Sequence, residues 1–129
     1  MSFLKNMFSS SENQSDSKTE MIWNNLTDLG QLDEIISNSN EKPAVIFKHS
    51  TRCSVSRMAL KQFENEFKLS HKVTPYFLDL IAYREISNEI ASRFGVLHES
   101  PQILLIKEGQ STYDASHSAI DAEVLEELV

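Results

Sequence analysis

Residues 44–69 read AVIFKHSTRCSVSRMALKQFENEFKL and carry the strongest structural signals of the chain. The apolar run Ala44–Lys48 is bounded by Pro43 and by a polar pair at 50–51, which predicts a short buried strand. From Cys53 to about Leu69 the apolar residues recur every three or four positions, as in an amphipathic helix. The stretch therefore predicts a strand that enters a helix through a short polar turn carrying a cysteine.

The segments on either side repeat this alternation. Strands are predicted at about 21–26, 73–80, 103–106 and 111–115, and helices at about 28–39, 86–94 and 123–129. Pro75 argues for an edge or a bulge in its strand, Gly95 closes a helix, and Gly109 supplies a turn between the last two strands. The order β-α-β-α-β-α-β-β-α predicts an α/β fold with a central mixed β-sheet flanked by helices on both faces. The alternating part should be parallel and the closing hairpin antiparallel, a pattern that resembles a thioredoxin-like domain.

Length and composition exclude several classes of protein. A chain of 129 residues suits one domain, and a net charge of −7 lacks the basic footprint of a nucleic-acid binder. No apolar run approaches the roughly 20 residues of a membrane span, and residues 1–8 do not resemble a signal peptide. The single cysteine excludes an internal disulfide and suits a reducing compartment, so we expect a cytoplasmic protein.

The first 20 residues differ from the rest of the chain. They contain six serines and few apolar groups beyond Phe8. Such a composition cannot bury enough apolar surface to offset its ordering entropy, so we expect a disordered Ser-rich leader over 1–20 and a thioredoxin-like domain over 21–129. An alternative is that Phe3, Leu4, Met7 and Phe8 form one weak amphipathic turn that touches a partner.

Cys53 is the candidate catalytic nucleophile. Its predicted place is the first turn of a helix, where free backbone N–H groups and the positive end of the helix dipole favour a thiolate. Arg52 adds a positive charge next to it, and His49 and Lys48 are expected to add more. The alternative is a buried structural cysteine, but a polar and basic turn is an unusual place for one.

Ser56 stands where a two-cysteine redox motif would have its second thiol. With serine there, a mixed disulfide on Cys53 can be resolved only by an outside thiol. Two interpretations of Ser56 stay open: it donates a hydrogen bond to the thiolate, or it is an ordinary residue of the first helical turn.

Two further features are expected beside Cys53. Ser100-Pro101 precedes a core strand, where thioredoxin-like domains place a cis-proline that faces the nucleophile. Counting outward from Gly109 brings Ser116-His117 level with Pro101 in an antiparallel hairpin. His117 would then be a proton donor or substrate contact, or else a plain surface histidine.

No metal site is expected. The residues His49, Cys53, His98 and His117 lack the paired spacings that tetrahedral zinc requires. The glycines form no phosphate-binding loop.

Four blocks resemble the YtxJ family of monothiol bacilliredoxins, which are thioredoxin-like proteins of bacillithiol redox control. They are FKHSTRCSVS at 47–56, FLDL at 77–80, HESPQ at 98–102 and ASH at 115–117. The resemblance covers about residues 21–129 and leaves the leader out. It implies that Cys53 is the nucleophile and that Ser100-Pro101 is the cis-proline region.

The resemblance also implies the activity, a monothiol thiol-disulfide oxidoreductase that removes bacillithiol from mixed disulfides on proteins. The co-substrate would be a low-molecular-weight thiol such as bacillithiol, with no bound cofactor. Partners would be proteins carrying mixed disulfides, and neither nucleic acid nor a membrane. Rim cations Lys48, Arg52 and Arg57 would attract the malate carboxylates of bacillithiol. Two other functions stay open, a non-catalytic thioredoxin-like adaptor and an iron–sulfur carrier of the monothiol glutaredoxin kind.

Overall fold

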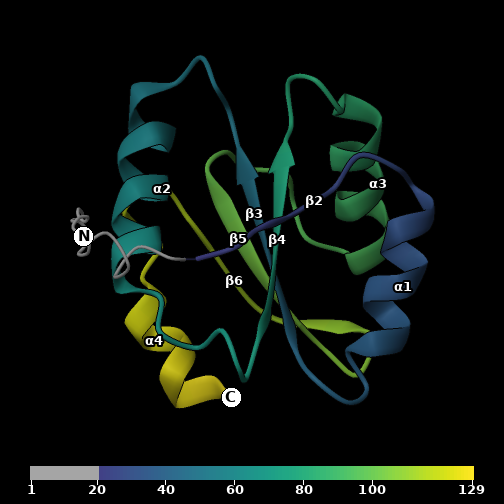
Figure 1. The fold of residues 1–129 in the computed structure, drawn as a ribbon. Helices are drawn as coiled ribbons and strands as arrows, with labels where there is room; N and C mark the ends of the chain where they lie inside the picture. The colour runs from purple at the N-terminus through teal and green to yellow at the C-terminus, as the bar shows by residue number, and fades with distance from the viewer. Residues whose placement is uncertain (1–20) are drawn as a thin grey trace, which may run out of the picture.

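The computed structural model describes residues 21–129, and the predicted leader over 1–20 lies outside them. Five strands form one sheet in the order β2-β4-β3-β5-β6 (Figure 1). The strands are β2 (Asn24–Asn25), β3 (Ala44–His49), β4 (Thr74–Asp79), β5 (Gln102–Lys107) and β6 (Gln110–Ser116). The helices are α1 (Gly30–Asn38), α2 (Ser54–Glu66), α3 (Arg84–Phe94) and α4 (Ala122–Leu128), with a 3-10 turn η2 at His117–Ala119.

The sheet is mixed, as the sequence predicts, but its direction changes earlier than expected. Strands β2, β4 and β3 are parallel, and β5 already runs antiparallel to β3. Gly95 ends α3 in the left-handed conformation with φ 66°, and the connection to β5 returns the chain to the end of the sheet where β3 finishes. Gln102 therefore pairs with Lys48, which brings the start of β5 to the end of β3 that leads to Cys53.

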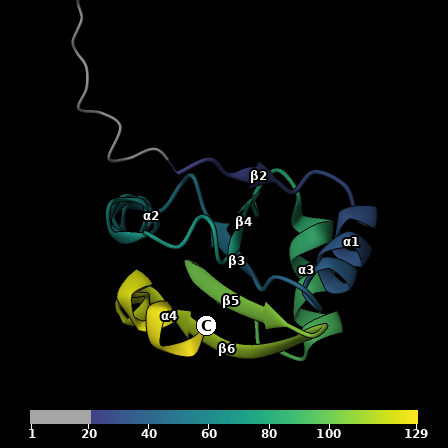
Figure 2. The ribbon, with the colours of Figure 1, turned by 60° about the horizontal axis from the view of Figure 1, so that its bottom comes forward.

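Helices cover both faces of the sheet, α2 and α4 on one and α1 and α3 on the other (Figure 2). In β3, Val45 and Phe47 point into the α2–α4 core, and Ala44 and Ile46 point into the α1–α3 core. Every residue of β3 is buried. A strand covered on both sides needs an unbroken apolar run, which is why this segment could be identified from the sequence.

Pro75 lies at a local edge although β4 is an inner strand. The Thr74 N–H donates to the Pro43 carbonyl on the β3 side. Because backbone groups alternate in direction along a strand, those of Pro75 point to the opposite side, toward β2. There β2 has not yet begun, because its first pair is Asn24 with Tyr76. The missing N–H of Pro75 therefore costs no ladder bond, and its carbonyl accepts a 3.0 Å bond from Asn24 Nδ2.

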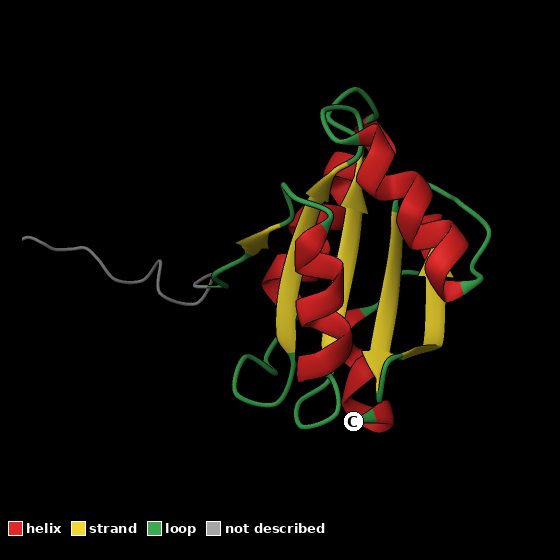
Figure 3. Ribbon diagram, turned by 90° about the vertical axis from the view of Figure 1, so that its right-hand side faces the viewer, coloured by secondary structure: helices red, strands yellow, loops and turns green. Residues whose placement is uncertain are grey.

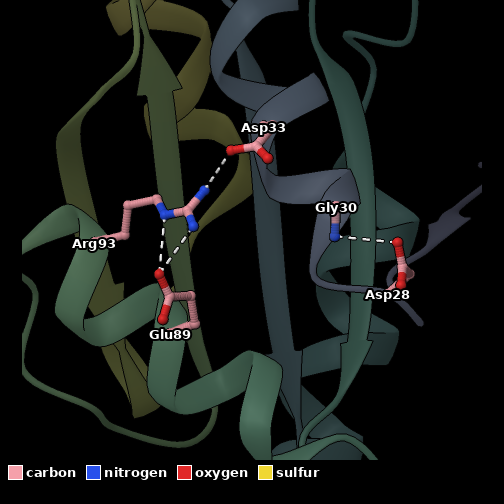
Figure 4. A network of polar contacts seen from close by, with 5 residues as sticks. All are labelled: Asp28, Gly30, Asp33, Glu89 and Arg93. Carbon is pink, nitrogen blue, oxygen red and sulfur yellow. Dashed lines mark hydrogen bonds and ion pairs between the residues drawn. The ribbon is translucent and has the colours of Figure 1, made fainter.

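The α1–α3 layer is tied together at its surface. Arg93 of α3 contacts Asp33 of α1 at 2.8 Å and Glu89 of its own helix at 2.9 Å (Figure 4). Before α1, the Asp28 carboxylate accepts the Gly30 N–H at 3.1 Å. Seen from this side, both helices lie in front of the strands (Figure 3).

The element ends differ in detail from the predicted ones. The strand expected over 21–26 is only Asn24–Asn25, because two exposed asparagines offer no apolar face to the sheet. Helix α2 stops at Glu66, and Phe67 continues in an extended conformation while staying buried. The turn η2 was not predicted. Within residues 21–129, no helix is long and apolar enough to cross a membrane.

Candidate active site

Cys53 is the N-cap residue of α2, held in an extended conformation with φ −114° and ψ 122°. Its N–H donates to the Ser50 carbonyl at 3.3 Å, and its carbonyl accepts the Arg57 N–H at 3.1 Å. The thiol is free and partly exposed. The Cys53 side chain makes no capping hydrogen bond to the 13-residue helix. The first N–H groups of the helix have no intrahelical partner. A negatively charged group at the start of a helix faces the positive end of the helix dipole.

Two arginines, Arg52 and Arg57, lie close to Cys53 in the sequence. The first turn of α2 has no acidic residue. Arg52 is exposed beside Cys53, and the exposed Arg57 folds back so that Nη1 donates to the Thr51 carbonyl at 3.3 Å. Both guanidinium groups therefore belong to the turn that carries the sulfur.

Ser56 and His49 form a buried pair at the same turn. Ser56 is fully buried, and its Oγ accepts the Ser50 N–H at 3.0 Å and lies 2.8 Å from His49 Nδ1. Burial lowers the pKa of His49; the Asp79 carboxylate partly offsets this, and Arg57 adds to it. The imidazole is therefore neutral near pH 7. The ring of Phe77 packs 5.5 Å from it, centroid to centroid.

The tautomer of His49 decides what Ser56 can do. If Nδ1 is bare, the Ser56 hydroxyl donates its only proton to the imidazole and has none for the sulfur. If Nδ1 carries the proton, the imidazole donates to Ser56 Oγ, and the hydroxyl proton is free for Cys53. The 2.8 Å contact serves either arrangement. It links His49 and Ser56, two residues whose roles the sequence predicts independently of each other.

The β5–β6 hairpin brings His117 next to Pro101, as counting eight residues to either side of Gly109 predicts. Gln102 pairs with Ser116, and the His117 N–H donates to the Pro101 carbonyl at 3.0 Å. The Ser100–Pro101 peptide bond is cis, and His117 is held at a left-handed φ of 55°. Its Nε2 lies 3.7 Å from Glu99 Oε1, a contact that the sequence analysis missed.

Lys48 does not lie at the rim, which corrects the sequence-based expectation. Alternation along β3 turns its side chain to the α1–α3 face, where it is 0% exposed and Nζ has no hydrogen-bond partner among the described residues. Burial, with a contribution from Arg84, lowers the pKa of Lys48 to about 8. An amine in this place cannot meet a carboxylate at the surface.

His98 also lies away from Cys53. It faces the buried Ser87 of α3, with Nδ1 3.4 Å from Ser87 Oγ, and burial followed by the charges of Lys48 and Arg84 lowers its pKa. Gln102 lies on the same side as Lys48 and donates from Nε2 to the Leu97 carbonyl at 3.0 Å. Within residues 21–129, no three His, Cys, Asp or Glu side chains gather as a metal site would require.

A groove beside the nucleophile was not predicted from the sequence. It has a volume of about 500 Å³ and runs between α2 and the segment made of η2 and the start of α4. Its lining includes Val55, two residues after Cys53, and His117, whose N–H donates to the Pro101 carbonyl. The signal that could have revealed it is the pair Val55 and Met58, apolar residues three apart on the outer side of α2.

Comparison with known proteins agrees with this geometry. The model of the family Monothiol bacilliredoxin BrxC matches residues 24–125. A solved structure with a thioredoxin fold, described as a candidate oxidoreductase, is 29% identical with a TM-score of 0.68 and covers 80% of this chain and 89% of that one.

Thioredoxins share the architecture at lower identity. Mitochondrial thioredoxin 3 from Saccharomyces cerevisiae is 21% identical with a TM-score of 0.59, covering 88% of this chain and 96% of that one. Fasciola hepatica thioredoxin is 19% identical with a TM-score of 0.60, covering 81% and 93%. At such identities the likeness establishes the thioredoxin fold alone. Together with the family match over residues 24–125, the fold gives the chain a thiol redox role, and the chain belongs to the monothiol bacilliredoxin family.

Proposed function

We propose that this protein removes bacillithiol from mixed disulfides on other proteins through the thiolate of Cys53. The observation that carries the proposal is the position of Cys53, which is the N-cap of α2, partly exposed and the single cysteine of the chain. The buried Ser56 occupies the place of a second thiol. The site can therefore accept a thiol group but cannot expel it from within.

The reaction has two exchange steps. In the first, the Cys53 thiolate attacks the bacillithiol sulfur of a modified protein, a new disulfide forms at Cys53, and the client leaves as a thiolate. In the second, an outside thiolate attacks that disulfide, takes up the bacillithiol as a new low-molecular-weight disulfide, and frees Cys53. The two electrons that reduce the client come from Cys53 and the outside thiol, so no bound cofactor is needed.

Selectivity for an anionic thiol would come from the arginines. Bacillithiol carries malate carboxylates, and Arg52 and Arg57 both belong to the turn that bears Cys53. Lys48 is left out of this proposal because it is buried on the other face of the sheet. A single free thiol suits a reducing compartment, so the proposed location is the cytosol.

His49 and Ser56 would act as positioning residues for the sulfur. In the Nδ1–H tautomer, Ser56 accepts from both His49 and the Ser50 N–H and turns its own proton toward Cys53. A hydroxyl donor favours the thiolate that attacks in the first step and leaves in the second. Because burial lowers the pKa of His49, its imidazole adds no charge beside the sulfur near pH 7.

Intact-mass analysis tests the proposal. Reduced protein is mixed separately with bacillithiol disulfide and glutathione disulfide at pH 5.5, 6.5, 7.5 and 8.5 (about one pH unit apart, to span the free-thiol region). We expect a single adduct at Cys53 that forms faster with bacillithiol and persists below pH 7. Slow, unselective addition only near the free-thiol pKa of about 8.5 would overturn the enzyme and favour an adaptor role.

A further inference from the structure

The groove between α2 and the η2–α4 segment is open to solvent, and six of its ten lining residues are apolar. Its lining residues are Val55, Met58, Ala59, Gln62, His117, Ser118, Ala119, Ile120, Asp121 and Val124. Met58 is 72% exposed and Val55 is 49% exposed, although both are large apolar side chains. Methionine adapts its shape to different apolar partners, which makes it common on binding surfaces. Among the described residues, none covers the side chains of Val55 and Met58.

The described chain begins beside the same helix. Trp23 Nε1 donates to Glu64 Oε2 of α2 at 2.7 Å, and Met21 packs against the α2–α4 core. Figures 1 and 2 both show the first described residues next to α2. Glu64 and Met58 are six positions apart on the helix, an axial distance of about 9 Å. The preceding 20 residues therefore join the domain within reach of the groove.

The length of the leader suits this reach. Twelve residues, 9–20, separate Phe8 from Met21. A Ser-rich chain of that length has a root-mean-square span of about 17–21 Å. Effective concentration is highest when the linker span matches the distance to be bridged, and it reaches the millimolar range for short linkers. A contact of only millimolar intrinsic affinity would therefore be about half occupied.

The two surfaces are also complementary in chemistry. Residues 1–8 read MSFLKNMF, in which two apolar pairs flank Lys5 and no acidic residue occurs. Most lining residues of the groove are apolar, and Asp121 is its one acidic residue. This cationic octapeptide stands out in a chain whose net charge is −7.

We propose that the leader binds back into this groove, with Phe3-Leu4 and Met7-Phe8 against Met58 and Val55 and with Lys5 near Asp121. Val55 follows Cys53 by two residues at the start of α2, and His117 donates its N–H to the Pro101 carbonyl. A leader bound against them would compete with any large partner that approaches the sulfur. Small reagents would reach Cys53 with little hindrance. The docking itself does not depend on the proposed bacillithiol chemistry.

NMR of the full-length chain with ¹³C-labelled methionine methyl groups tests the docking without any thiol reaction. The test variant carries Phe3→Ser, Leu4→Ser, Met7→Ser and Phe8→Ser, and the matched control carries Ser9→Ala, Ser10→Ala and Ser11→Ala. The Met58 signal is assigned by its loss in Met58→Leu. We expect the Met58 signal to shift in the test variant, to stay unchanged in the control, and to be independent of protein concentration.

Two NMR results would overturn the docking of the leader. An identical Met58 signal in the wild type and the test variant would mean that the leader does not occupy the groove. A shift that grows with protein concentration would assign the groove to a second copy of the chain. Either result overturns the proposal.

A kinetic test uses the same variants. The test variant should react with a protein mixed disulfide about two-fold faster than the wild type, because a competing segment that occupies the groove about half of the time has been removed. Its rate with a small disulfide should stay the same. Adding Met58→Glu to the test variant should give no further acceleration, since both changes act on one contact. If Met58→Glu accelerates the test variant further, the leader does not dock at Met58.

Discussion

Ser56 Oγ lies 2.8 Å from His49 Nδ1, and this buried contact joins the end of β3 to the first turn of α2. Ser56 also accepts the Ser50 N–H, so one hydroxyl fixes both sides of the turn that carries Cys53. In a two-cysteine relative of this motif a thiol would stand at this position. The serine thus gives the turn a polar anchor and leaves it without an internal resolving group.

Ser56→Ala should destabilise the protein. The Ser50 N–H and His49 lose their partner in a buried site, which costs about 1–3 kcal/mol of the free energy of unfolding. The control is Ser54→Ala, the same change at an exposed position in the same turn. Urea denaturation measures both variants, and equal stability of the two would refute the anchoring role. If the hydroxyl also faces the sulfur, Ser56→Ala alone slows the reaction of Cys53 with a small disulfide at pH 7.

Ser56→Cys should convert the site to internal resolution. The introduced thiol stands three positions after Cys53, the spacing of two-cysteine redox motifs. After reaction with bacillithiol disulfide, the variant should lose its adduct in the absence of outside thiol and end as an internal disulfide. Ser92→Cys, which adds an exposed thiol on α3, should keep its adduct. Mass spectrometry reads both; an adduct that persists equally in the two variants would contradict the assignment of position 56.

Arg52→Ala and Arg57→Ala should each slow the reaction with bacillithiol disulfide about two- to five-fold, the effect of one exposed charge. The rate with a neutral disulfide should hardly change, and the difference should shrink at high salt. Lys72→Ala is the control, because Lys72 is exposed just before β4, at the opposite end of the sheet from Cys53. Equal slowing with charged and neutral disulfides would remove these arginines from anion recognition.

Lys48→Met should stabilise the protein at pH 7. Burial lowers the pKa of Lys48 from 10.5 to about 8, so the unfolded chain binds its proton more tightly than the folded one. The free energy of unfolding therefore rises with pH between about 8 and 10.5, and below pH 8 up to about 3 kcal/mol is lost. Lys48→Met should remove this rise. Lys61→Met, at an exposed position of α2, should retain it. Chemical denaturation at pH 7, 9 and 10 (steps chosen to cross that window) distinguishes the two.

The sequence predicted the active-site turn well because its signals are local. A buried apolar strand, a polar turn and a periodic helix are all contiguous in residues 44–69. The level of His117 was predicted by counting outward from Gly109, and the structure explains why the count holds. The turn consists of Glu108 and Gly109, both with positive φ, and next to it Ile106 pairs with Ser111. A bulge at Leu105/Ile106 then shifts the pairing by one residue, so that Gln102 pairs with Ser116, as counting equal distances from Gly109 predicts.

Other features depend on tertiary placement that a sequence pattern does not contain. Lys48 is next to His49 in the chain, but alternation along β3 places the two side chains on opposite faces of the sheet. From the sequence, a lysine at the end of an apolar strand is expected at the rim of the site. Its burial becomes evident only when the helices on both faces of the sheet are placed. The groove is similar, because its walls come from α2 and from the segment around η2, which lie far apart in the sequence.

Transfer of a bacillithiol group from a client protein to Cys53 can be followed directly by intact mass. Reduced protein is mixed with an equimolar amount of a bacillithiol-modified client, with no other thiol present, and both intact masses are recorded over time. We expect the client to lose the group and this protein to gain it at Cys53, one for one, and the reaction to stop after a single turnover. A client that keeps its bacillithiol, or that instead forms a disulfide with Cys53, would contradict the account.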